Sequence, residues 1–145
     1  MVRVGRMRLH CTLWFPPPAP PWSTNQDRNL NPYDRAERIR LWKETVQMYW
    51  RWEGNSNPIG PSGIQGAWPE EPTPMLVELT IPFTKNRRRD PHNYCGTVLK
   101  AVIDGLVIAS GIPDDTPEWV GHREPKLVKG DTVYLHLTPL ESEKA

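Results

Sequence analysis

Carboxylate side chains gather in the second half of the chain, where element ends are expected. Asp90 follows a run of basic residues, and Asp114 and Asp115 form an adjacent pair directly after Pro113. Carboxylate oxygens suit a hard divalent cation such as Mg²⁺, and such an ion assists phosphodiester hydrolysis by polarising phosphate and activating water. The pattern therefore predicts a metal site at which Asp90, Asp114 and Asp115 converge.

Basic side chains stand immediately before the first of these carboxylates. The run consists of Lys85, Arg87, Arg88 and Arg89. Because such side chains neutralise backbone phosphates, an acidic metal site beside them is typical of a nuclease. Each part alone has a plainer interpretation, since an Asp-Asp pair often marks a turn and an arginine run is often a solvated surface. Their conjunction favours the nuclease.

A polar stripe on an otherwise apolar helix also needs an explanation. The spacing of Thr97, Lys100 and Asp104 places them on one side of the helix predicted over 97–110. Lys100 and Asp104 could form a helix ion pair of roughly a few tenths of a kcal/mol. A role for Asp104 in the site is the alternative, and the sequence leaves both open.

Hydrophobic periodicity indicates the elements that must position these residues. Apolar and polar residues alternate over 7–15 and 75–83, which predicts two strands, and shorter strands are expected near 118–124 and 132–138. A helix is predicted from about 34 to 52, with Asp34 as its N-cap, and the second helix should end at Gly111. This order predicts an α/β fold, a small mixed β-sheet packed with two main helices.

The length and composition fit one domain over residues 1–145, with a mobile Gly- and Pro-rich loop or lid at about 54–74.

Lys and Arg number 18 against 17 Asp and Glu, so nucleic-acid binding must rest on local clusters. The two cysteines lack metal-ligand spacing and are expected to be reduced. Neither a membrane span nor a secretory signal is apparent, which favours the cytoplasm. Most of the seven tryptophans should pack in the core or at a dimer face, although Trp68 in the loop could stack on unpaired bases.

Three segments together resemble the RusA family of Holliday junction resolvases. They are Arg89-Asp90-Pro91-His92-Asn93, then Lys100-Ala101-Val102-Ile103-Asp104-Gly105-Leu106, then Gly111-Ile112-Pro113-Asp114-Asp115. The segment from Leu9 through the prolines to Asn25 is also similar to the opening of that family. The likeness is dense from about residue 87 to 120.

The resemblance implies a dimeric α/β nuclease from a bacterium or phage that cuts branched DNA at four-way junctions in recombination and repair. Asp90, Asp114 and Asp115 would hold Mg²⁺, and Lys100 would stabilise phosphate charge in the transition state. Lys85, Arg87, Arg88, Arg89 and Asn93 would bind the DNA. A homodimer is expected because paired nicks need two equivalent sites.

Two departures from the family pattern matter. His92 stands where the family usually has a second aspartate, and a few extra residues around 94–97 separate Asn93 from the lysine helix. His92 would be a metal ligand or position water, and imidazole suits Zn²⁺ or Mn²⁺ better than Mg²⁺. A branched-DNA binding protein that does not cleave, and a nuclease for flaps or forks, are the alternatives.

Overall fold

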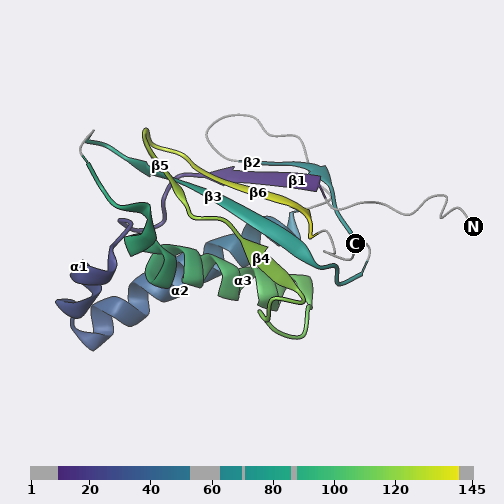
Figure 1. Ribbon diagram of the computed structural model, residues 1–145, viewed down its shortest axis with the longest axis horizontal. Helices are drawn as coiled ribbons and strands as arrows, with labels where there is room; N and C mark the ends of the chain where they lie inside the picture. Colours follow the sequence, from purple (N-terminus) through teal and green to yellow (C-terminus); the bar gives the residue numbers. More distant parts are fainter. Residues whose placement is uncertain (1–9, 53–62, 70, 86–87, 141–145) are drawn as a thin grey trace, which may run out of the picture.

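Strands from both halves of the chain form one mixed sheet with helices on one of its faces (Figure 1). The computed structural model describes residues 10–52, 63–69, 71–85 and 88–140. Within this part the strands are β1 (His10–Phe15), β2 (Gly63–Ala67), β3 (Met75–Phe83), β4 (Val120–His122), β5 (Lys126–Lys129) and β6 (Val133–Pro139). The order across the sheet is β2-β1-β6-β3-β4, and β5 pairs with β3 further along the same edge. The mixed sheet predicted from the sequence is confirmed.

Alternating burial explains why these segments are strands. In β1, Cys11, Leu13 and Phe15 are buried while the residues between them are partly exposed. The longer strand β3 repeats this pattern, and its neighbour β6 does the same. Since side chains of a strand point alternately to the two faces, the apolar set of every central strand turns to the same side. That side is the one that the helices cover.

The helical segments are α1 (Thr24–Arg28), α2 (Pro32–Arg51), a 3-10 turn η1 (Pro91–Tyr94), a π-helical turn η2 (Cys95–Leu99) and α3 (Lys100–Ser110). The N-cap predicted at Asp34 is wrong, because Asn31 caps α2 with a side-chain oxygen that accepts from the Asp34 N–H at 2.9 Å. Pro32 then occupies the first helical turn, where its missing N–H costs nothing. The predicted stop of the second helix is confirmed, since Gly111 has φ +80° and caps α3.

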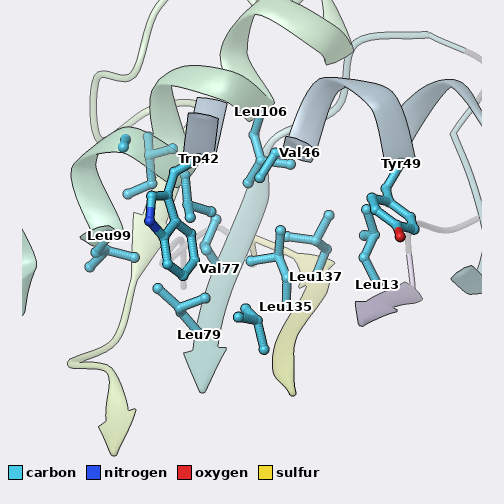
Figure 2. Packing of buried hydrophobic residues seen from close by; sticks show 14 of the residues in the cluster. Leu13, Trp42, Val46, Tyr49, Val77, Leu79, Leu99, Leu106, Leu135 and Leu137 are labelled. Atoms are coloured by element: carbon cyan, nitrogen blue, oxygen red, sulfur yellow. The ribbon is translucent and has the colours of Figure 1, made fainter. Parts of the chain in front are cut away.

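Large apolar side chains fill the space between α2, α3 and the sheet (Figure 2). Trp42 of α2 is fully buried and lies beside Val77 and Leu79 of β3. Val46 and Leu106 meet where the two helices cross. A methyl group on Gly105 would stand 2.7 Å from the Lys43 carbonyl oxygen, so the helices can approach this closely because residue 105 has no side chain.

The prediction of a loop over about 54–74 is wrong for residues 63–67. Residues 63–67 form β2, which pairs antiparallel with β1 and covers its otherwise unpaired edge. Trp68 is buried with its ring centroid 4.6 Å from that of Trp50, so it packs in the core and does not offer a face to DNA bases. Residues 53–62 and 70 lie outside the described part, as do residues 7–9 of the first predicted strand.

The ends of two other elements differ from those predicted from the sequence. The helix predicted from residue 97 becomes α-helical at Lys100, since residues 95–99 take a π-helical turn. The strand predicted near 118–124 is confined to Val120–His122, and β5 follows it as a separate strand. No helix in the described ranges is both long and apolar enough to cross a membrane.

Candidate active site

Lys100 connects the first turn of α3 to the segment that follows the helix. Its ammonium nitrogen lies 3.1 Å from Asp104 Oδ1 and 3.1 Å from Asp115 Oδ2. Asp104 is one helical turn further along α3, whereas Asp115 belongs to the connection between α3 and β4. The structure therefore brings two predicted site residues, Lys100 and Asp115, into direct contact.

The charges of this cluster stabilise one another. Hydrogen bonding to Asp104, and then to Asp115, raises the pKa of the Lys100 ammonium above its ordinary value. The hydrogen bond from Lys100 in turn lowers the pKa of the Asp115 carboxyl. Because these side chains remain partly exposed, solvent screens the pairs and their contribution to folding stability is small. Lys100 is a cation and Asp115 an anion at neutral pH.

Asp114 plays a local part in this segment. Its Oδ1 accepts a hydrogen bond from the backbone N–H of Asp115 at 2.7 Å. Both aspartates of the pair are exposed. The backbone at Asp114 and Asp115 is irregular, and the turn that the plainer interpretation expected lies a few residues later, at 117–119.

Asp90 and His92 lie in a second group, at the start of the irregular helical stretch before α3. Asp90 is the N-cap of η1, and its Oδ1 accepts from the His92 N–H at 3.1 Å. Pro91 follows the cap, as is favourable at a first helical position. His92 is exposed, and its Nδ1 lies 3.9 Å from Glu124 Oε2. Two residues of this group, Asp90 and His92, were predicted from the sequence, and the structure adds Glu124.

The Cys95 thiol is influenced by two carboxylates of the second group, Asp90 and Glu124. Burial raises the pKa of its thiol, and the negative charges of Glu124 and Asp90 raise it further. Two carboxylates from segments far apart in the sequence thus act on one side chain. Glu124 follows β4, which runs parallel to β3 in the register Met75↔Val120. No spacing in the sequence gave a signal for Glu124, since its place depends on that strand pairing.

The predicted DNA-binding residues lie around Asp90. Lys85 and Arg88 are exposed. Arg89 donates to the Lys85 carbonyl oxygen at 3.1 Å, and its guanidinium carbon lies 3.9 Å from the centre of the Phe83 ring. The Asn93 carbonyl oxygen accepts a hydrogen bond from Thr24 of α1. Arg87 lies outside the described residues.

The predicted metal ligands divide between these groups. Asp115 faces an ammonium, Asp114 binds backbone, and Asp90 caps a helical turn. Among the described residues, no group of three or more His, Cys, Asp or Glu side chains is placed so that it could hold a metal ion. The chemistry of the ligands suits a hard cation, but this arrangement of them does not form a single site.

Comparison with known proteins adds no family assignment. No protein-family model matches the chain, and no curated protein matches its sequence.

Proposed function

We propose that this protein is a metal-dependent endonuclease that cuts branched DNA, with four-way junctions as the leading substrate. The contact between Lys100 and Asp115 carries the proposal, because it unites the helix lysine and the Asp-Asp segment, two of the three segments that resemble the RusA family. A divalent cation, Mg²⁺ or Mn²⁺, would polarise the scissile phosphate. The RusA resemblance implies Asp90, Asp114 and Asp115 as its ligands, with His92 as a further ligand or a residue that positions water. Because these side chains stand in two separate groups in the structure, the proposal requires that the cation and the DNA bring the two groups together.

The chain's own cations have separable roles in this proposal. Lys100 would stabilise the negative charge that develops on phosphate, since preorganised donors act most strongly where charge appears. Its two carboxylate partners hold it in place and keep it protonated. Lys85, Arg88 and Arg89 precede Asp90, so they would bind the backbone on the approach to the site.

Substitution of the carboxylates tests the proposal directly. Asp115→Asn and Asp90→Asn should each slow cleavage of a labelled four-way junction roughly 100-fold or more, with Mg²⁺ or with Mn²⁺, while junction affinity changes little. Glu118→Gln is the matched control, because Glu118 is an exposed acid of the same loop region outside both clusters. Full cleavage by either aspartate variant would refute the assignment.

A second candidate is a branched-DNA binding protein without cleavage. It is favoured by the ion pair between Asp115 and Lys100 and by the division of the acids into two groups. The same junction assay separates the two functions, since binding without nicks under either metal supports this candidate. A panel with flaps and replication forks decides whether another branched structure is the preferred substrate.

A further inference from the structure

A groove of about 810 Å³ lies between the proline-rich segment after β1 and the end of β3. The segment contributes Pro17, Pro18, Ala19, Pro20 and Pro21 to its lining. Phe83 and Tyr94 add aromatic surface. Rigid proline rings and aromatic rings together make an apolar lining that suits a flat, apolar ligand.

Arg89 stacks on the Phe83 ring in this groove, and the buried Tyr94 ring meets Phe83 edge to face. The Arg89 guanidinium carbon lies 3.9 Å from the centre of the Phe83 ring, and the Phe83 and Tyr94 centroids are 5.4 Å apart at an interplanar angle of 65°. The hydrogen bond from Arg89 to the Lys85 carbonyl oxygen holds the guanidinium. Stacks of arginine and aromatic side chains are the surfaces on which proteins place unpaired nucleobases.

The groove also carries polar groups that could read the edge of a base. Asp131, an acceptor, lies in the turn between β5 and β6. The backbone N–H of its neighbour Gly130 donates to the Phe83 carbonyl oxygen at 2.9 Å, which fixes the turn against the end of β3. A carboxylate can accept from the exocyclic amino group of a base, and a guanidinium can donate to base acceptors.

We propose that this groove binds an unpaired nucleobase of the DNA substrate, stacked on Arg89 or Phe83; the inference rests on the proposed function. Position supports it, because Arg89 immediately precedes Asp90 and Tyr94 ends the helical turn that Asp90 caps. A nucleotide with its base in the groove would have its phosphate near the candidate active site. The adjacent cations Lys85 and Arg88 favour a polyanion over a proline-rich peptide or a second copy of this chain.

Photocrosslinking locates the bound base without requiring cleavage. The full chain is mixed in EDTA with four-way junctions that carry 5-iododeoxyuridine at successive positions near the branch point, irradiated, and analysed by mass spectrometry. The expected result is a crosslink to Phe83 from one or two positions. Bound junctions that crosslink solely to other parts of the protein would overturn the inference.

Variants give an independent readout. Phe83→Leu should weaken junction binding about fivefold or more, and Phe83→Tyr should retain it, because stacking needs an aromatic ring. Tyr33→Leu is the matched control, since Tyr33 is 87% exposed on α2 and does not line the groove. If Phe83→Leu does not fold, the exposed residue Asp131 allows the same test through Asp131→Ala, which should also weaken binding.

The outcomes separate this inference from the proposed function. Junction cleavage with unchanged binding by Phe83→Leu and Asp131→Ala would overturn the base groove and leave the nuclease proposal standing. Failure to bind any DNA would overturn both. Self-association of the protein that Phe83→Leu abolishes, with DNA binding intact, would assign the groove to a second copy and also overturn the inference.

Discussion

At the scale of single residues, the ion pairs of Lys100 determine how the candidate site responds to pH. Asp115 has a lowered pKa in the folded chain because Lys100 donates to it. A carboxyl of this kind stabilises the fold above its ordinary pKa of 3.8, and this contribution disappears as pH falls through the lower folded value. The raised pKa of Lys100 acts in the opposite sense, so its contribution is present below 10.5 and disappears at higher pH.

Lys100→Met should therefore raise the pKa of Asp115 toward its ordinary value. The expected change is upward, and a carboxyl-detected NMR titration of Asp115 measures it. The urea midpoint of the variant should also fall less steeply than that of the original chain as pH decreases below about 4. Lys129→Met, which removes an exposed cation from β5, should change neither measurement. An unmoved Asp115 titration would show that the ion pair is absent in solution.

Sequence patterns predict contacts between residues of one element, but they do not predict contacts that depend on the pairing of distant strands. The helical spacing of Lys100 and Asp104 predicts a contact within one element, and their ion pair is present. The likeness of the Asp-Asp segment to a known motif pointed to Asp115. Glu124 could not be found in this way, because its neighbourhood with His92 arises from the pairing of β4 with β3.

At the scale of elements, the crossing of α2 and α3 depends on Gly105. An added methyl group there would meet the Lys43 carbonyl oxygen at 2.7 Å and the Val46 Cβ at 3.2 Å. Gly105→Ala should therefore destabilise the fold by about 1–3 kcal/mol, as overpacked sites do. Gly96→Ala is the matched control, since nothing lies within 4 Å of its added methyl group, and it should be neutral or slightly stabilising. Denaturant unfolding measures both, and equal stability of the two variants would contradict the close crossing.

A second element-scale prediction concerns β2 and the tryptophan that follows it. Trp68 is 7% exposed and its ring meets Trp50 edge to face, whereas Trp52 is 43% exposed. Trp68→Ala should cost about 3–5 kcal/mol of unfolding free energy, and Trp52→Ala clearly less. A thermal melt of both variants compares them. If Trp68→Ala loses little unfolding free energy, Trp68 is exposed in solution. It could then stack on unpaired bases, as expected from the sequence.

The elements that periodicity identified are those with a strong local signal. Alternation predicts β3 and β6, and the three- and four-residue spacing predicts α2, because each pattern lies within one segment. The Gly-rich strand β2 carries almost no such pattern, and it forms because β1 offers it an edge. Strand β5 likewise depends on a parallel pairing with β3, in the register Ile81↔Leu127, that no short stretch of sequence encodes.

At the scale of the whole molecule, the proposed binding of DNA must come from local charge. The formal net charge is +1, so no general positive field attracts the polyanion. Lys85, Arg88 and Arg89, which precede Asp90, are the described cations that we propose to attract DNA near the site. Arg88→Ala should weaken junction binding and reduce the slope of log affinity against log salt by roughly one. Measurements of affinity at several salt concentrations test this, and an unchanged slope would place the phosphate contacts elsewhere.

Resolution of a four-way junction requires two nicks at symmetric positions, so we expect the active species to be a homodimer with one site in each protomer. Sedimentation should then give twice the chain mass of 16.7 kDa. Subunits of the original chain exchanged with an excess of Asp115→Asn should form mixed dimers that nick one strand and leave the junction unresolved, because each site cuts the strand it holds. Paired nicks at full rate from such mixtures would mean that a single site serves both strands, and two-fold symmetry would then have no role in the reaction.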